Sequence, residues 1–428
     1  MIGRNVVRYV LAIATLALLL SNSAQASEDE TMLMKQMSEL RNLIEMQQNQ
    51  LDSQLKEIQN LKNQLDQNTK AIVAKDENAE DADSSKMLTS SLPKVNLSLY
   101  GHVNKAALFA DNGDDSSWYF VDNDNSDTRL GLRAAVEKFE NWSIGGRIEY
   151  GIVSNASDDV NQLNDSNATS SNFQLRWAEV SVEHDTFGKV SLGKGDSASN
   201  NSAEVDLSGT DVAAYSSISD TAGAMLWYDN ATATLTDLEV GDVFSNFDGL
   251  SRTDRLRYDS PTFAGFSLAL SASSGDAYDA AIVYNRKFGE TKVAAALAAA
   301  NPGTDTVDMI YSGSASILFP IGINATVSAA TQDLDMSDRE DPVNWYAKLG
   351  YIAKFTESST TAFSADYGET TDLDADGDTG KTFAVAAVHN LPDWGTQLYL
   401  VYRLHQLDRS NADYEDINVV MTGARVKF

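Results

Sequence analysis

The chain has 428 residues, with 62 Asp and Glu against 32 Lys and Arg, a formal net charge of -30 and no cysteine. This acidity excludes a protein that binds nucleic acid, because contacts with phosphates require Lys and Arg. The lack of cysteine excludes a disulfide-stapled scaffold and a thiolate metal site.

Residues 1–26 have the three parts of a secretory signal peptide. Arg4 and Arg8 precede an apolar run of about eleven residues, and Ala24-Gln25-Ala26 forms a small-x-small cleavage site. The run is too short for a spanning helix, which needs about 20 apolar residues. We therefore expect cleavage before Ser27 and export from the cytoplasm.

Residues 27–72 are predicted to form a coiled coil, because apolar side chains recur every seven positions over 31–72. The a positions are Met37, Ile44, Leu51, Ile58, Leu65 and Ile72, and the d positions are Leu33, Leu40, Gln47, Gln54, Leu61 and Asn68. The seam favours association between chains and leaves dimer against trimer open. A single amphipathic helix on a surface is the alternative. Residues 73–93, acidic and rich in serine, are typical of a linker.

Residues 94–428 change to a period of two. Segments such as SLYGHVNKAALFA, QLRWAEVSVEH and NWYAKLGYIAKF are apolar on one side, and about sixteen of them can be counted. Short connections (KFEN, DTFG, SPTFAG, KFGET, FPIG, KFTES, LPDWG) alternate with longer polar segments at 110–126, 153–172, 194–252, 332–343, 369–380 and 407–415. This alternation is typical of an outer-membrane β-barrel.

The short connections also carry aromatic rings, as the interfacial girdle of such a barrel requires. They are Phe139, Trp142, Phe187, Phe263, Phe288, Phe319, Phe355 and Trp394. The polar strand faces carry too many cations for a packed core, so we expect a water-filled lumen inside and lipid outside.

Alternation along the strands assigns six arginines to the lumen: Arg129, Arg133, Arg147, Arg176, Arg255 and Arg257. On the strand that carries Arg176, Glu179 and Glu183 then fall on the outer face, where charge against lipid is unfavourable. A subunit interface or a β-bulge would resolve this conflict, and we favour the interface.

The barrel segments resemble the trimeric general porins of Gram-negative outer membranes. The matching stretches are SLYGHVN, TRLGLRAAVEKFENWSIGGRIEYG, FQLRWAEVSVEHDTFGKVSLGKGDS, RLRYDSPTFAGFS and the terminal GARVKF. A coiled coil before the barrel resembles the DcaP-like subgroup, which is also trimeric and tuned to small anionic dicarboxylates.

The resemblance implies a homotrimer and a third long loop, within 194–252, that folds inward and faces a ladder of arginines. Glu204, Asp206, Asp211 and Asp220 are the candidate acids of that loop. It also implies an assembly signal for the barrel-insertion machinery at the C-terminus, formed here by Gly423, Val426 and Phe428.

Little other chemistry emerges from the sequence. DLDADGD, residues 372–378, matches the front of a calcium loop, but Phe383 stands where the bidentate Glu belongs, so an acidic surface loop is favoured. The four histidines have no Ser-His-Asp or metal-ligand spacing, and we expect no enzyme activity, metal or cofactor.

The predicted function is therefore passive diffusion of small hydrophilic solutes across an outer membrane, in contact with lipid and lipopolysaccharide. The coiled coil would lie in the periplasm. At ~1.5 Å per residue it would be about 60 Å long. The alternative function is an envelope tether, in which this helix spans toward the cell wall.

Overall fold

The computed structural model describes residues 56, 92, 94–166, 172–356, 358–410 and 412–428. The chain divides into two compact units, Met1–Ser85 and Lys86–Phe428. The expected signal peptide, coiled coil and linker lie outside the described residues, apart from Lys56 and Leu92, and stay predictions.

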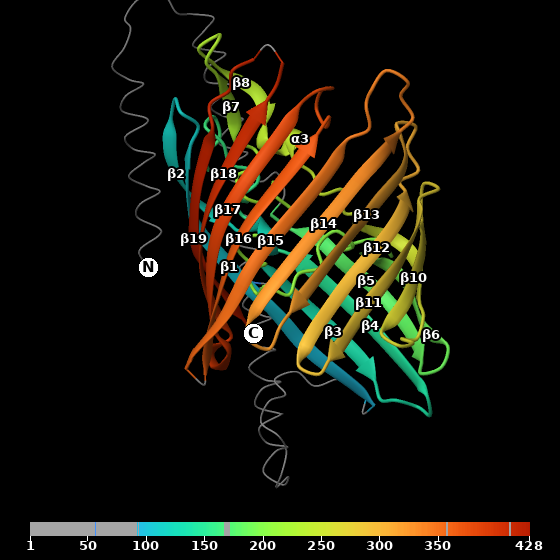
Figure 1. The fold of residues 1–428 in the computed structure, drawn as a ribbon. Coiled ribbons are helices and arrows are strands. Elements are labelled where there is room, and N and C mark those ends of the chain that lie inside the picture. The colour runs from blue at the N-terminus through green and yellow to red at the C-terminus, as the bar shows by residue number, and fades with distance from the viewer. Residues whose placement is uncertain (1–55, 57–91, 93, 167–171, 357, 411) are drawn as a thin grey trace, which may run out of the picture. The chain divides into compact units, whose positions relative to one another are not determined.

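The described strands form a closed, antiparallel, all-β barrel of sixteen strands, which confirms this part of the prediction (Figure 1). The first strands are β1 Val95–Asp111, β2 Ser116–Asp122, β3 Arg129–Val136, β4 Trp142–Gly151, β5 Gln174–His184, β6 Gly188–Asp196, β7 Leu226–Asp229, β8 Thr234–Glu239 and β9 Arg252–Asp259. The remaining strands are β10 Phe266–Ser273, β11 Tyr278–Phe288, β12 Thr291–Asn301, β13 Val307–Leu318, β14 Ile323–Leu334, β15 Val343–Thr356, β16 Ser359–Thr371, β17 Thr379–Leu391, β18 Thr396–Asp408 and β19 Ile417–Lys427.

Two features reconcile the nineteen strands with the sixteen positions in the wall. β2 pairs with one half of β1 and β3 with the other half, so together they occupy one position. β7 and β8 pair only with each other as strands, apart from the wall. The barrel closes where β19 returns to β1, with His102 opposite Lys427.

The helical elements are short. They are η1 Asp124–Ser126 between β2 and β3, α3 Val240–Val243 and η2 Pro392–Trp394. Among the described residues, helices lack the length and apolar character that crossing a membrane requires.

Most wall strands have a polar or small inner face and an apolar outer face. On β14, Asn324, Thr326 and Ser328 are buried inside the ring, whereas Ile323 and Val327 are about half exposed outside it. Exposed apolar side chains around a wall are unstable in water and stable against hydrocarbon. All eight aromatic residues predicted for the girdle are exposed as well.

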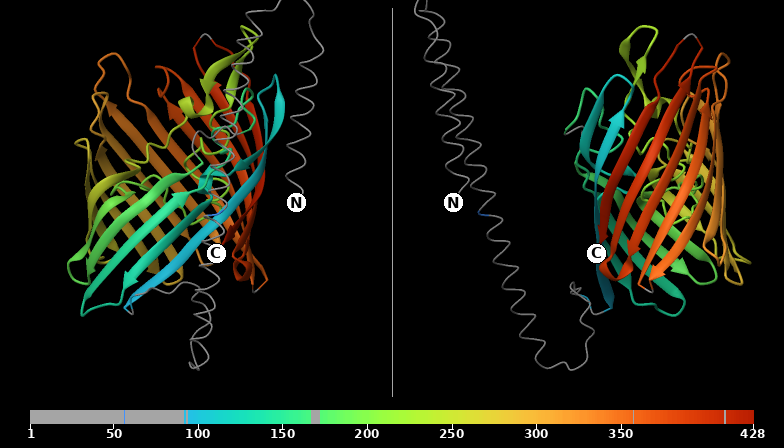
Figure 2. Two further views of the ribbon diagram at one scale, coloured as in Figure 1. Left: turned by 180° about the vertical axis from the view of Figure 1, so that it is seen from behind. Right: turned by 60° about the vertical axis from the view of Figure 1, so that its left-hand side comes forward.

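The wall is uneven in height (Figure 2). Strands β15 to β18 have 13 or 14 residues, whereas β6 and β9 have 9 and 8. Glycine allows some of the short turns to close tightly. At Gly188, φ is 85° and a Cβ would lie 2.2 Å from the carbonyl oxygen of Asp259.

A β-bulge in β5 corrects the interpretation of its acids. Glu149 on β4 pairs with Trp177 and the next residue pairs with Leu175, which leaves Arg176 unpaired between them. The extra residue shifts the alternation, so Arg176 and Glu179 both face inward. The expected placement of Glu179 on the outer face was therefore wrong, and no subunit interface is needed to explain it.

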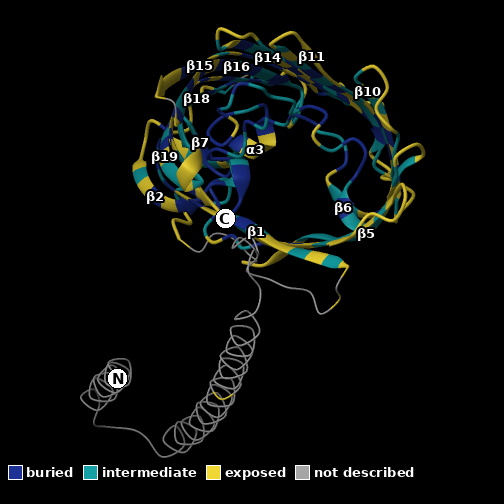
Figure 3. Cartoon of the chain, turned by 90° about the horizontal axis from the view of Figure 1, so that it is seen from below, coloured by how far each residue is buried: buried dark blue, intermediate teal, exposed yellow. Residues whose placement is uncertain are grey.

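Seen along the barrel axis, the segment of residues 197–251 between β6 and β9 falls within the ring of strands (Figure 3), and its β7–β8 hairpin rises at the long-loop end (Figure 1). The backbone N–H groups of Val205 and Leu207 donate to the hydroxyls of Ser314 and Ser316 on β13, at 2.9 and 3.0 Å. This alternate row of inward serines thus holds the segment against the wall.

The same segment fills part of the interior with an apolar core, which the expected water-filled lumen did not include. The 197–251 segment contributes to this core Val212, Ala213, Ile218, Met225, Trp227, Val240 and Phe244. The wall side includes Leu108, Val388, Tyr399, Val401, Val419 and Met421. One part of the barrel is therefore packed and dry, because the inner faces of β17 to β19 are apolar where the segment covers them.

Candidate functional site

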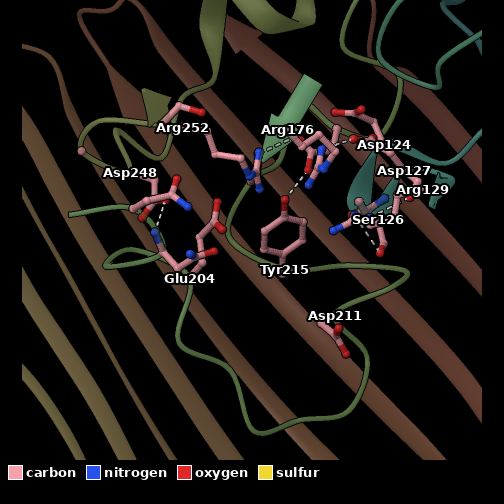
Figure 4. A pocket seen from close by; sticks show the side chains of 17 residues that line it. Asp124, Ser126, Asp127, Arg129, Arg176, Glu204, Asp211, Tyr215, Asp248 and Arg252 are labelled. Atoms are coloured by element: carbon pink, nitrogen blue, oxygen red, sulfur yellow. Dashed lines mark hydrogen bonds and ion pairs between the residues drawn. The ribbon is translucent and has the colours of Figure 1, made fainter. Parts of the chain in front are cut away.

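The candidate site is a cavity of about 570 Å³ between the wall and the 197–251 segment (Figure 4). Three arginines line it from the wall side: Arg129, Arg176 and Arg252. Six acids line it as well: Asp124, Asp127, Glu204, Asp211, Asp220 and Asp248. Charges of both signs therefore face one small volume.

Arg129 and Arg176 are held by groups close to the β2–β3 junction. Arg129 begins β3, and its Nε donates to the carbonyl oxygen of Asp127 at 3.0 Å. Arg176, which the bulge turns inward, contacts the carboxylates of Asp127 at 2.5 Å and Glu149 at 3.0 Å. Within the described residues, Arg129 has no carboxylate partner, so its charge is the less compensated of the two.

Sequence alternation did not identify Arg252 as a residue that lines the cavity. It shares the alternation of Leu256, which faces outward, so strand periodicity assigns it to the outer face. Because it is the first residue of β9, its side chain instead turns into the cavity, where its Nε lies 3.1 Å from Asp196. The signal that could have found it is its place at a strand end directly after the long loop.

The acids of the segment are held in different ways. Asp220 accepts hydrogen bonds from the hydroxyls of Tyr215 and Ser217. Glu204 accepts from the side-chain amide of Asn246 at 2.9 Å. Asp211 keeps 57% of its side chain exposed and lies 4.0 Å from Arg425. Three of the four predicted acids therefore reach the cavity.

A comparison with protein-family models matches residues 74–410 to the Gram-negative porins. The chain belongs to this family. A comparison with proteins of curated function finds no match.

Solved structures show the same fold at low sequence identity. The anion-selective porin of Comamonas acidovorans is 17% identical, with a TM-score of 0.53 over 78% of this chain and 100% of that one. OmpT of Vibrio cholerae is 13% identical, with a TM-score of 0.52 over 81% and 100%. The DcaP channel of Acinetobacter baumannii is 14% identical, with a TM-score of 0.51 over 80% and 99%. The family is one of outer-membrane channels rather than enzymes.

Burial raises the pKa of several carboxyl groups in the porin's 197–251 segment. The pKa of Glu204 is raised to about 8 by burial and by the nearby Asp248. Burial raises the pKa of Asp248 to about 7 and that of Asp220 to about 6. Part of the negative charge around the cavity is therefore absent at neutral pH.

Asp206, the fourth predicted acid, does not line the cavity. Its carboxylate meets Nζ of Lys348 on β15 at 2.6 Å and accepts from the Thr326 hydroxyl at 3.1 Å. Lys348 also donates to the carbonyl oxygen of Ala214 at 2.6 Å. Asp206 thus fastens the segment to the wall of the porin.

The other predicted arginines lie outside the cavity lining. Arg255 and Arg257 form ion pairs with Glu179 and Asp259. Arg147 pairs with Glu149 and stacks on Trp177, and Arg133 stacks on Tyr100. Sequence alternation places all of these inward but cannot tell a compensated arginine from a free one.

The acids of loop 372–378 form ion pairs with arginines of neighbouring loops. Arg409 pairs with Asp374 and Asp378, and Arg339 pairs with Asp376 at 3.1 Å. Among the described residues, no cluster of three or more acids and histidines is arranged to hold a metal ion. The loop therefore cross-links neighbouring loops of the porin.

At the C-terminus, Val426 and Phe428 are exposed on the outer face. A Cβ on Gly423 would lie 2.4 Å from both the carbonyl oxygen of Lys105 and the hydroxyl of Tyr399. Close packing therefore requires glycine at position 423, independently of any role in assembly.

Proposed function

We propose that this porin lets small hydrophilic solutes diffuse through a constriction formed by the 197–251 segment. The observation that carries the proposal is the 570 Å³ cavity between the wall arginines and the segment's acids. Opposed charges at a narrow point orient charged and zwitterionic solutes, and the size of the opening sets the cutoff.

The proposal includes a preference for small anions, such as dicarboxylates, at neutral pH. Arg129 supports it, because in the described barrel this guanidinium lacks a carboxylate partner and faces the cavity. The raised pKa values of Glu204 and Asp248 also support it, because their protonation removes negative charge. The related porin of Comamonas acidovorans is described as anion-selective.

The test is the reversal potential in a salt gradient across a planar bilayer. Arg129→Ala should lower the anion-to-cation permeability ratio more than Arg176→Ala, because Arg176 is already bound to two carboxylates. Lys138→Ala is the matched control, since Lys138 pairs with Asp185 at an exposed turn. Unchanged reversal potentials in both arginine variants would contradict the proposed constriction.

A homotrimer is part of the proposal. Lys105 lies on the outer face of β1 and contacts Asp122 at 2.5 Å and the Ser154 hydroxyl at 2.8 Å. Lys105 and Ser154 border an outer-wall hollow of about 560 Å³, which Phe120 and Thr422 also line. A lysine facing the middle of a bilayer costs about 2–4 kcal/mol. A second protomer that covers this surface removes the cost.

The remaining partners complete the proposal. Outer-membrane lipid contacts the apolar wall and lipopolysaccharide surrounds the long-loop end. The barrel-insertion machinery recognises Gly423, Val426 and Phe428. The predicted coiled coil lies in the periplasm.

A further inference from the structure

The inner wall near the short-turn end carries cations that the proposed constriction does not use. Arg133, Lys287, Lys292 and Lys427 lie on inward-facing positions of β3, β11, β12 and β19. All four are exposed to the lumen. None of them forms an ion pair within the described part of the barrel.

The acids on the inner-wall strands of this region are matched by cations, whereas Glu137, Glu140, Glu290 and Asp393 lie in the short turns. Glu149, Glu179 and Asp259 are already paired with arginines of the wall. Glu183 faces Lys189 across β5 and β6, so these two charges offset each other. A net positive charge therefore remains on the periplasmic half of the inner wall.

The opposite mouth has the opposite sign. The loops at the long-loop end are rich in acids. Apart from Lys194 and Arg252 at the two ends of the 194–252 segment, Arg339 and Arg409 are the only Lys or Arg residues in their sequence. Both arginines form ion pairs with acids of residues 372–378. Lys381 and Lys105 on the adjoining strands pair with Asp408 and Asp122, but acids still outnumber Lys and Arg in these loops.

We infer that the two ends form a bipolar channel that rectifies ionic current. The acidic mouth accumulates cations and the basic end accumulates anions. When the extracellular side is positive, both ions are driven from their enriched ends into the channel, and the current rises. When the polarity is reversed, both are drawn out of the channel and the current falls.

The inference rests on the proposed channel function and is tested by current–voltage curves in symmetric salt. In ~0.1 M KCl, where the Debye length is about 10 Å, the current with the extracellular side positive should exceed the reverse current by about 1.5-fold or more. In ~1 M KCl, where the Debye length is about 3 Å, the ratio should approach one.

The orientation of each inserted channel can be determined by labelling an introduced cysteine, because the chain contains no native cysteine. A Ser337→Cys background places one thiol on an exposed loop at the long-loop end. A thiol reagent that is membrane-impermeant and too large to pass through the channel then changes the current only when it is added to the side that bears this loop.

The matched variants lie close together on the paired strands β11 and β12. Lys287→Gln combined with Lys292→Gln removes two inward charges and should bring the low-salt ratio toward one. Arg286→Gln removes an outward charge, which stacks on Phe288, and should leave the ratio unchanged. All three positions are exposed, so folding should be unaffected.

The outcomes separate the rectification from the channel itself. A conducting wild-type channel with a linear current–voltage curve in low salt would overturn the inference and leave the channel standing. A double variant that rectifies like the wild type would overturn it as well. A folded protein without any conductance would instead overturn the proposed function.

Discussion

Lys348 offers the sharpest test of how the 197–251 segment is held. Its side chain is fully buried, and the Asp206 carboxylate that it contacts is 6% exposed. Lys348→Met leaves a buried carboxylate without its cation, a change that typically costs about 3–5 kcal/mol. The cost falls on the docked state of the segment, because Asp206 regains water when the segment lifts from the wall.

The expected magnitude follows from this cost. A change of ~1.4 kcal/mol is tenfold in an equilibrium constant, so opening of the segment should become about 10²- to 10³-fold more frequent or greater. Hydrogen exchange of the amides of residues 203–214 measures this opening. Single-channel recordings should show larger current noise in the same variant.

Two controls isolate the buried pair. Lys138 and Asp185 have the same 2.6 Å separation, but their side chains are 48% and 53% exposed. Lys138→Met should therefore change little, since such exposed pairs contribute about 0–1 kcal/mol. Lys348→Met combined with Asp206→Leu removes both charges and should restore much of the protection. Exchange in Lys348→Met within threefold of wild type would refute the anchor.

Three further predictions concern selectivity, assembly and insertion. Carboxyl groups with raised pKa values are charged only above those values, so lowering the pH from about 9 to about 6 should neutralise Glu204 and Asp248 and shift the reversal potential toward anion selectivity. A variant with both Glu204→Gln and Asp248→Asn should lose most of this shift. A variant that titrates like the wild type would contradict the role of these two acids. Lys105→Glu places a carboxylate against Asp122 and should lower the temperature of trimer dissociation on native gels, whereas unchanged trimers would count against this surface as the interface. A few residues added after Phe428 should reduce the amount of folded barrel in outer-membrane fractions, and normal levels would argue against a terminal recognition signal.

Strand alternation and turn spacing were sufficient to predict the barrel and its sixteen strands. The period of two is a local property that each segment carries in its own sequence. The segment expected as a loop at 110–126 nevertheless contains β2, because a short strand paired with only half of β1 leaves little periodic signal.

The site was predicted less completely, because its geometry depends on departures from regular alternation. The bulge at Arg176 reversed the face assigned to Glu179, and Arg252 was not identified because its inward position at a strand end departs from alternation. The partner of Asp206 is 142 positions away along the chain, and no local pattern reveals such a contact.

The apolar core between the 197–251 segment and strands β17 to β19 changes what shortening the segment would achieve. Deleting a constriction is expected to widen a pore. Here the deletion would expose Val388, Val401, Val419 and Met421 on the inner wall. A hydrophobic lining excludes water from a narrow passage. A wider bore would then conduct less, because dewetting would close it, and a larger channel requires polar replacements on these strands together with the deletion.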